Sequence, residues 1–454
     1  MYIVEKQKNI PIIVDADVCV LGGSCTGVFA AIRAARLGAN VVIVEKQNCF
    51  GGTATVSGVC IWHSFKDFKF DKDVIAGLSL EVIERLKKRD LVKIDLDKID
   101  SYIFNTEELK IELDEMILEA GVKPYLHTSF VDVISSDNTI EAVIVENKSG
   151  RGAIKAKMFI DCTGDGDLCE RLGIESYKSE FTQPSTVCAK MTGLEMELYG
   201  LGNIGSFDLN KAFLEHKDEF GIKHDGWGWS CEIPNVQDVS FQAITKVVGY
   251  DCASGEGLTY AEMEGRKQLR AIHDLIRKYG PQNSEVGLVD ISAYIGIRET
   301  RHYRTMYKLT ENDCLNGSKF DDAIANCTMR VDMHHSDKAG CTFKFMDGTC
   351  QYMRSGFPTE YGRWRAETTD NPTYYQIPYR SIITDKFDNL LLAGRMIDAD
   401  RGGFASARVM VNLNQLGEAA GVAACTAIEE NKTVCDINTD KLREKLKIGG
   451  SIVL

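Results

Sequence analysis

The first 45 residues contain the pattern that most constrains how this chain can fold. Residues 16–21 (ADVCVL) form a short apolar run with two valines, and glycines and small residues follow at 22–27. An alanine-rich amphipathic stretch then ends at Gly38, and a second apolar run, 40–44, leads into Glu45. Strand, glycine turn, helix, strand and terminal acid in this order predict a βαβ unit that binds a dinucleotide.

Each position of the glycine turn has a physical role. Gly22 permits the tight turn, and Gly27 lets the helix pack closely on the strand. The free N–H groups at the helix start can face a pyrophosphate. Glu45 is placed to accept hydrogen bonds from the adenosine ribose and repels a 2′-phosphate, which disfavours NADP. Ser24 stands where the fingerprint has its middle glycine; it is small, and its hydroxyl can itself contact phosphate.

Three further segments favour FAD over NAD. Residues 51–53 (GGT) follow Glu45 closely, where a long diphosphate and ribitol need close backbone approach. Residues 157–168 read as a strand that runs into a glycine-containing turn. Residues 389–424 read as an apolar strand, a polar turn and a long helix of small residues. We expect this helix to start near Ser406 and to direct its positive dipole at the flavin pyrimidine ring.

These segments resemble the FAD-dependent oxidoreductase family of glutathione-reductase-like flavoproteins, which includes relatives of the heterodisulfide reductase A subunit. The resemblance covers nearly the whole chain and includes residues 105–134, 295–314, 329–335 and 374–383. The cysteine runs that hold iron–sulfur clusters in the heterodisulfide reductase relatives are missing. The expected FAD-binding residues are Gly22, Gly23, Ser24, Thr26, Gly27, Glu45, Lys46, Gly51, Gly52, Thr53, Phe130, Thr163, Gly164, Asp165, Gly394, Arg395, Asp398, Ser406 and Arg408.

Because the cofactor segments are scattered along the chain, we expect an α/β fold with a discontinuous, Rossmann-like FAD-binding domain of the glutathione-reductase type. A second, α+β domain would cap the substrate site. The expected FAD-binding domain comprises 1–60, 100–175 and 375–435; the cap domain comprises 61–99 and 176–374; and 436–454 form a short charged helix and tail.

Composition narrows the partners. The formal net charge of −13 argues against a nucleic-acid surface, which needs a basic field. Apolar runs are too short for a membrane span, and the first twenty residues lack the apolar core of a signal peptide. The 15 cysteines include no CxxC pair, so we expect a reducing, cytoplasmic location and no metal site. A homo-oligomer and the identity of the electron acceptor stay open.

The cap domain is expected to hold the substrate, because a flavin carries out hydride transfer itself. Arg298, Arg301 and His302 lie close together in the sequence. The two guanidiniums could clamp a carboxylate while the imidazole moves a proton. The alternative is an ion-pair network that anchors the cap domain to the FAD-binding domain.

Further candidates follow along the chain. His334 and His335 end a strand-like run, and adjacent side chains on a strand point to opposite faces, so at most one of them faces the site. Arg401 and Arg408 flank the flavin-facing turn, where each could contact the substrate, contact the flavin or form a plain salt bridge.

The flavin is expected to be held non-covalently. His63 and the nearby Cys60 are the alternative points for a covalent link, and Trp227 and Trp229 are interpreted as an aromatic lining.

The sequence thus predicts an FAD-dependent oxidoreductase that transfers a hydride between flavin N5 and a small polar metabolite bearing a carboxylate or hydroxyls. The alternatives are a flavin-containing electron-transfer subunit that works with a redox protein partner, and a protein that uses FAD without redox change.

Overall fold

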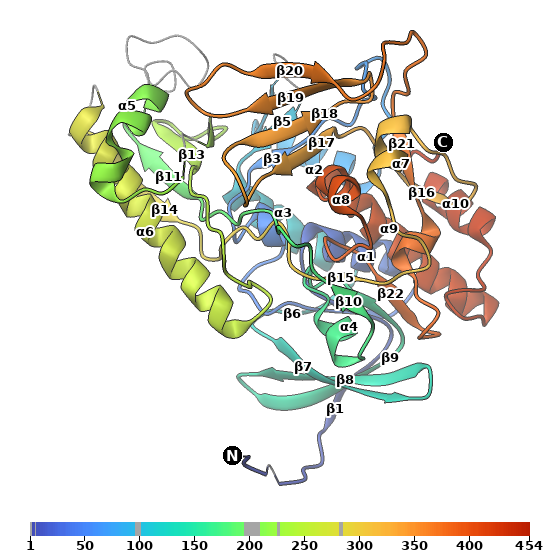
Figure 1. Ribbon diagram of the computed structural model, residues 1–454. Helices are drawn as coiled ribbons and strands as arrows, with labels where there is room; N and C mark the ends of the chain where they lie inside the picture. The colour runs from blue at the N-terminus through green and yellow to red at the C-terminus, as the bar shows by residue number, and fades with distance from the viewer. Residues whose placement is uncertain (1, 5, 96–100, 195–208, 225–227, 281–284) are drawn as a thin grey trace.

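A seven-stranded sheet forms the centre of the computed structural model, which describes residues 2–4, 6–95, 101–194, 209–224, 228–280 and 285–454. Its order is β6-β2-β1-β9-β8-β7, and β22 also pairs with β9 (Figure 1). The pairs β6·β2, β2·β1, β1·β9 and β9·β22 are parallel, whereas β9·β8 and β8·β7 are antiparallel. The strands are β1 Ile12–Leu21, β2 Val41–Val44, β6 Lys123–Tyr125, β7 Ser129–Ser136, β8 Thr139–Asn147, β9 Gly150–Asp161 and β22 Leu390–Leu392.

Strand β9 joins segments that are far apart in the sequence. Its first half pairs with β8, where Ile154 lies opposite Val143, and its last residues pair with β22, where Ile160 lies opposite Leu391. Along its length it also pairs with β1. The parallel part of the sheet is therefore assembled from three distant pieces of chain, which confirms the predicted Rossmann-like α/β fold.

Alternate residues of β1 face two different cores. Val18 and Val20 pack into the larger core, and Cys19 and Leu21 pack into the smaller core on the other face of the sheet. This is the period of two that strand geometry imposes, and all four side chains are buried because both faces of the parallel sheet are covered.

Helices α1 (Cys25–Arg36) and α9 (Met410–Glu430) form the inner layer over the larger core. They approach so closely that a Cβ on Gly417 would lie 2.0 Å from the carbonyl oxygen of Thr26. Outside them lie α2 Leu78–Lys87, α3 Thr106–Glu119 and α10 Thr439–Ile448, the last of which matches the predicted C-terminal helix.

The predicted single helix starting near Ser406 is wrong. Two helices lie there, α8 (Arg401–Ala407) and α9, and Ser406 belongs to the first. The helix is interrupted at Arg408 and Val409 because Val409 adopts an extended conformation, with φ −67° and ψ 144°. The break turns the start of α9 into a separate helix N-terminus.

Smaller sheets and helices cover one end of the central sheet. The longest of these helices, α6 (Gly255–Tyr279), begins where the side chain of Ser254 caps it by accepting a hydrogen bond from the backbone N–H of Gly257. The remaining strands form sheets in the orders β12-β13-β11-β14, β17-β18-β19-β20, β3-β5-β4, β10-β15 and β16-β21. Their bounds are β3 Ile61–Trp62, β4 Val92–Asp95, β5 Ser101–Phe104, β10 Ser176–Tyr177, β11 Ala189–Thr192, β12 Trp229–Glu232, β13 Val239–Ala243, β14 Gly287–Ile291, β15 His302–Tyr303, β16 Ala323–Cys327, β17 Val331–His334, β18 Cys341–Lys344, β19 Thr349–Met353, β20 Glu360–Arg363 and β21 Tyr375–Pro378. The short helices are α4 Asp167–Arg171, α5 Leu209–His216 and α7 Glu311–Asn316.

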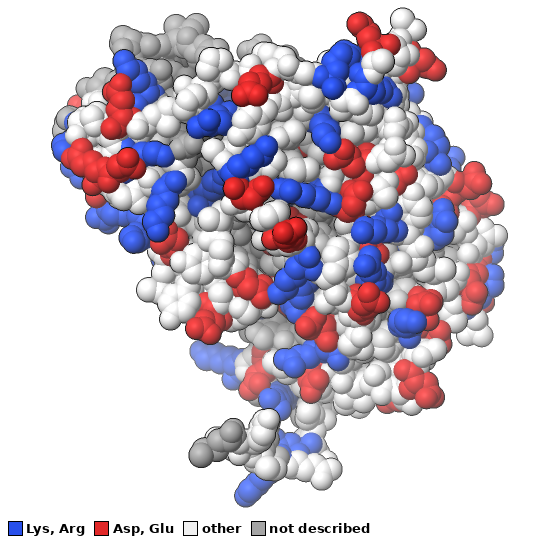
Figure 2. All heavy atoms as spheres, in the orientation of Figure 1, with Lys and Arg blue, Asp and Glu red and all other residues white. Residues whose placement is uncertain are grey.

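The division into two domains stays a proposal. Its boundary near residue 100 separates β4 from β5, although these two strands pair with each other. Searched over the described residues, no helix has the length and apolar character needed to cross a membrane. On the face drawn in Figure 2, positive and negative side chains are mixed rather than gathered into one field.

Candidate active site

One cavity of about 970 Å³ connects the predicted cofactor segments with the outer sheets. This is the upper end of the size range of ligand pockets in proteins. Its wall includes the ends of β1 and β2, the turn after β9, the start of α9, and residues of β13, β17 and β18. The cavity therefore lies at the carboxyl ends of parallel strands, where open α/β sheets bind their ligands.

The glycine turn and Glu45 form one end of this cavity. Gly22 has a φ of +94°, and a Cβ there would lie 2.4 Å from the carbonyl oxygen of Cys162. The backbone N–H of Gly23 donates to Oε2 of Glu45 at 2.6 Å, which holds this carboxylate beside the turn. Helix α1 has no acidic residue in its first turn, so its N-terminus is free to attract an anion.

The opposite end is built around the start of α9. Val409, at the N-cap of α9, offers no side-chain hydrogen bond to the helix. Asn414, one turn further on, is 1% exposed and lines the cavity, and its Oδ1 has no hydrogen-bond partner among the described residues. Buried polar groups without partners are rare in folded proteins, so this end of the cavity indicates a bound ligand. Elsewhere in the wall, beside the turn after β9, Arg395 forms an ion pair with Asp165 at 2.5 Å.

This arrangement fits FAD. A close-approach glycine turn, a carboxylate for a ribose, and an uncapped helix N-terminus occur in the order in which the cofactor needs them. Most predicted cofactor residues line the cavity, namely Gly22, Ser24, Thr26, Glu45, Lys46, Gly51, Gly52, Thr53, Phe130, Thr163, Gly164, Asp165, Gly394, Arg395 and Arg408.

Four predicted cofactor residues are not in the cavity wall. Gly23 and Gly27 allow close packing behind the wall. A Cβ on Gly23 would lie 2.5 Å from the ring of Phe50, and one on Gly27 would lie 1.9 Å from the carbonyl oxygen of Gly22. Asp398 accepts a hydrogen bond from the hydroxyl of Tyr177 at 2.7 Å, and Ser406 donates to the carbonyl of Met329 at 2.5 Å. The structure thus gives the last two residues protein partners, and their cofactor role stays a prediction.

The outer part of the cavity is formed by one face of the sheet that contains β17 and β18. Arg330, Asp332 and His334 alternate along the chain, so they share a face, and all three line the cavity. Cys341 lies opposite His334, and Phe343 lies opposite Asp332, so both also face the cavity. We call these five residues the reactive face.

His335 is absent from the cavity wall, whereas His334 is part of it, as expected if at most one of the two histidines faces the site. Nε2 of His335 lies 2.7 Å from the hydroxyl of Thr342.

Three guanidiniums meet at the reactive face. Arg298 donates through Nη1 to the carbonyl of Pro184 and to the hydroxyl of Thr186, both at 2.6 Å. Arg330 lies over the ring of Phe343, 4.5 Å from its centroid. Arg408 donates to Oδ2 of Asp332 at 3.2 Å. Within the described part of the chain, Asp332 is the one carboxylate that forms an ion pair with any of these three arginines.

The electrostatics of the reactive face follow from burial and from this positive excess. Burial, with Arg330 next, lowers the pKa of His63 to about 4. Burial also lowers the pKa of His334, although Asp332 opposes the shift. For Asp332 burial acts to raise the pKa, but His334 and Arg408 outweigh it and hold the pKa well below its usual range. Clusters of perturbed groups of this kind are typical of functional sites.

Three predicted catalytic residues lie outside the cavity wall. Arg301 pairs with Asp167 at 3.2 Å, and Arg401 lies 3.4 Å from Asp337. His302 is buried, with Nδ1 2.8 Å from the carbonyl of Ile397 and its other nitrogen facing a glutamate. The contacts of Arg301 and His302 are of the kind expected of the ion-pair network named as the alternative, and that of Arg401 is of the kind expected of a plain salt bridge. A catalytic role for the three stays a prediction.

His63 lines the cavity, whereas Cys60 does not. The sulfur of Cys60 lies 3.5 Å from the sulfur of Cys231. Trp229 is part of the cavity wall, and Trp227 lies outside the described residues. Sequence reasoning missed Arg330 and Cys341. The alternation of Arg330, Asp332 and His334 in the sequence was the available signal for the first of these.

Comparison with known proteins adds the family. A family model described as FAD dependent oxidoreductase matches residues 17–446. The mitochondrial dihydrolipoyl dehydrogenase of Schizosaccharomyces pombe is 28% identical over 159 residues, which cover 33% of this chain and 28% of that protein. The thiamine thiazole synthase of Pyrococcus horikoshii is 24% identical over 160 residues, which cover 34% of this chain and 58% of that protein. The chain matches less than two thirds of the length of these relatives.

Solved structures show a looser likeness. A geranylgeranyl bacteriochlorophyll reductase-like protein of Thermoplasma acidophilum has a TM-score of 0.47 and 12% identity, over 96% of this chain and 83% of that one. The p-nitrophenol 4-monooxygenase of Pseudomonas putida has a TM-score of 0.47 and 10% identity, over 96% of this chain and 87% of that one.

Proposed function

The chain belongs to the FAD-dependent oxidoreductase family, and from this premise we propose that it oxidises or reduces a small anionic metabolite, such as a carboxylate, bound at the reactive face. When bound, FAD supplies the hydride acceptor or donor for such a reaction. The tasks left to the protein are to hold the anion, to exclude water and to move a proton.

The observation that carries the proposal is the uncompensated positive charge at the reactive face. Of Arg298, Arg330 and Arg408, only Arg408 forms an ion pair with a carboxylate among the described residues, and that carboxylate is Asp332. The lowered pKa values of His63 and His334 keep both imidazoles neutral at pH 7, so they neither add to this charge nor cancel it. Partly buried charges that lack an opposite charge are costly, and an anionic ligand lowers that cost. Guanidiniums also bind carboxylates in bidentate fashion.

His334 is proposed to move the proton. It lines the cavity beside the guanidiniums, and its Nε2 lies 3.3 Å from Oδ1 of Asp332, which orients the ring. A neutral imidazole can accept a proton from a substrate hydroxyl or amine during oxidation and return it during reduction.

The experiment is a titration of the FAD-loaded enzyme with benzoate, followed by the flavin absorbance, with benzamide as the neutral probe of the same shape. We expect benzoate to bind at least tenfold more tightly than benzamide. Arg330→Gln should weaken benzoate roughly 10- to 100-fold, because hydrogen bonds to charged groups contribute about 1.5–3 kcal/mol. Arg380→Gln is the matched control, since Arg380 pairs with Asp322 at 3.0 Å outside the cavity wall.

Equal affinity for benzoate and benzamide, or equal loss in both variants, would reject an anion site at the reactive face. The flavin content of each variant, measured from its spectrum, shows whether the cofactor site itself has stayed intact.

A further inference from the structure

Cys341 has surroundings that set it apart from most cysteines of the chain. Eleven of the 15 cysteines are buried, and burial is the main cause that raises the pKa of ten of these. Cys341 is only partly buried and lines the cavity. Its sulfur lies 3.1 Å from Nδ1 of His334.

Asp332, His334 and Cys341 form a continuous chain of contacts across two strands. Asp332 and His334 share a face of β17, and the antiparallel register places Cys341 directly opposite His334 on β18. Oδ1 of Asp332 lies 3.3 Å from Nε2 of His334, and Nδ1 of the same ring faces the thiol. In the tautomer that carries its proton on Nε2, the lone pair of Nδ1 is turned toward Cys341. A nucleophile, a base within hydrogen-bond reach and a third group that orients the base are the pattern of covalent catalysis.

The charges at this place keep the thiol protonated at rest. Burial raises the pKa of Cys341 to about 11, and Asp332 adds to the shift, while Arg298 and Lys246 oppose it. The lowered pKa of His334 keeps its imidazole neutral. At neutral pH a protonated thiol therefore lies beside an unprotonated base, so the base can take the proton at the moment of attack.

We propose that Cys341 is a nucleophile of the substrate site and adds to the carbonyl carbon of an anionic carbonyl compound, such as an aldehyde acid or an oxo acid. The Sγ–C bond forms as the π bond of the carbonyl opens. The thiol proton passes to His334 and from there to the carbonyl oxygen. The product is a thiohemiacetal, and the step is redox-neutral and needs no further reagent. Positive charge from Arg298 and Arg408 stabilises the developing oxyanion.

This inference rests on the proposed function, because the same guanidiniums hold the anionic end of the substrate. It goes further by naming a carbonyl group as the reacting part and a side chain that bonds to it. The alternative is that Cys341 has no chemical role and only fills space between the strands.

The test measures alkylation of the FAD-loaded enzyme with iodoacetate and with iodoacetamide, read out for each cysteine by peptide mass spectrometry. Cys350, on the neighbouring strand β19, is similarly exposed and lies outside the cavity wall, so it is the internal reference. We expect Cys341 to react at least tenfold faster than Cys350 with iodoacetate, and to prefer iodoacetate over iodoacetamide. His334→Gln should slow Cys341 at least tenfold and leave Cys350 unchanged.

The carbonyl part is tested by protection. Glyoxylate, an anionic aldehyde, should protect Cys341 from iodoacetamide at concentrations where glycolate, its alcohol counterpart, does not. Equal rates at Cys341 and Cys350, or an unchanged rate in His334→Gln, would overturn the nucleophile. Equal protection by glycolate would overturn the carbonyl addition.

The benzoate titration and the alkylation experiment together separate this inference from the proposed function. If benzoate binding does not respond to Arg330→Gln but Cys341 still reacts selectively, the anion site fails and the reactive thiol remains.

Discussion

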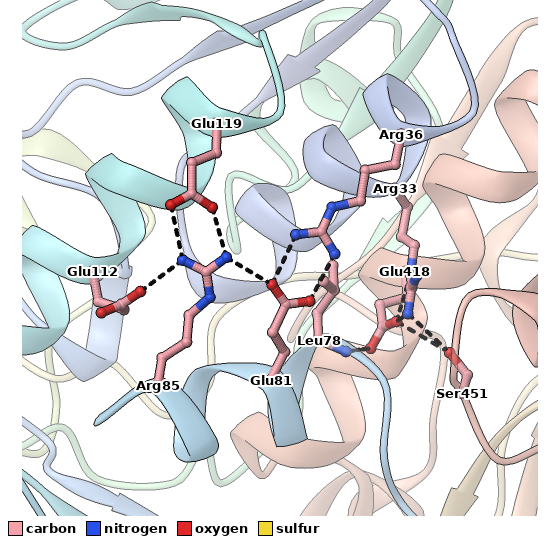
Figure 3. Close-up of polar contacts among 9 residues, drawn as sticks. All are labelled: Arg33, Arg36, Leu78, Glu81, Arg85, Glu112, Glu119, Glu418 and Ser451. Carbon is pink, nitrogen blue, oxygen red and sulfur yellow. Dashed lines mark hydrogen bonds and ion pairs between the residues drawn. The ribbon is translucent and has the colours of Figure 1, made fainter. Parts of the chain in front are cut away.

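Two groups of buried charges in this molecule differ in how completely the protein itself satisfies them. At the junction of α1, α2 and α9, Glu418 accepts hydrogen bonds from Arg33, from the backbone N–H of Leu78 at 3.0 Å and from the hydroxyl of Ser451 at 3.1 Å (Figure 3). Arg33 and Glu418 are 5% and 1% exposed. We call this group the closed cluster. At the reactive face, by contrast, only one of three guanidiniums, that of Arg408, forms an ion pair with a carboxylate among the described residues.

The difference teaches how to separate structural from functional charge. The closed cluster joins three helices and the C-terminal segment, and its acceptors and donors match without any ligand. The arginines at the reactive face carry an excess of positive charge, and they line a cavity. A buried charge that is satisfied within the protein indicates architecture, whereas an excess of one sign beside a cavity indicates what the ligand carries.

The largest expected effect breaks the closed cluster. Glu418→Ala leaves the Arg33 guanidinium buried without its carboxylate, so we expect the free energy of unfolding to fall by about 3–5 kcal/mol. Urea unfolding of the FAD-loaded protein, followed by far-UV circular dichroism, measures this loss. Glu146→Ala is the control: Glu146 pairs with Arg151 at 3.2 Å but is 50% exposed, so its loss should be about 0.2–1 kcal/mol. Losses of similar size in both variants would contradict the comparison.

The next effect changes the balance at the reactive face. Asp332→Asn removes the single carboxylate that opposes the three guanidiniums, so benzoate affinity should rise about tenfold through stronger Coulomb attraction. Turnover should fall in the same variant, because His334 loses the group that orients it. Binding that weakens, or turnover that persists, would show that Asp332 does not have this double role.

A smaller effect concerns pH. His63 in the folded protein binds a proton only near pH 4, whereas in the unfolded chain it does so near 6.5. The unfolded state therefore binds more protons between these values, and stability is lost as the pH falls through this window. His63→Gln should reduce the stability difference between pH 7 and pH 5 by about 1 kcal/mol, a figure discounted because the side chain is only half-buried. Denaturant midpoints at the two pH values measure this difference. The same change of midpoint in the parent protein and in His63→Gln would speak against the lowered pKa of His63.

The smallest effect is the sharpest contrast with Glu418. Arg330→Gln removes one of several like charges from the reactive face. The free energy of unfolding of the unliganded protein should therefore change by less than about 1 kcal/mol. The same unfolding measurement applies. A loss as large as that of Glu418→Ala would mean that Arg330 is structural.

The parts of the site that could be predicted from the sequence depend on local order. Residues 16–45 specify a strand, a turn and a helix whose neighbours in space are neighbours in sequence. The break before α9 could not be seen, because Arg408 and Val409 have no helix-breaking chemistry and their conformation is set by packing. Arg301 and His302 could not be separated from the site, since their partners, Asp167 and Glu299, become partners only through the fold.

Cys341 illustrates the same limit more clearly. In the sequence it is one of many isolated cysteines. Only the antiparallel register of β17 and β18 places it opposite His334, and only the position of this sheet over the cavity gives the pair a role. Register is a property of paired strands, and a single strand does not contain it.

The threefold pairing of β9 also has a consequence for biosynthesis. The pyrophosphate turn lies at the start of the chain, yet β22, which completes the parallel sheet, is made of residues 390–392. A ribosome adds roughly 5–20 residues per second, so the early βαβ unit waits on the order of tens of seconds for its last strand. During that interval the edge of β9 that β22 later covers is open to wrong partners. We therefore expect the nascent chain to depend on chaperones until β22 and α9 have emerged, and cofactor loading to be a late event in its maturation.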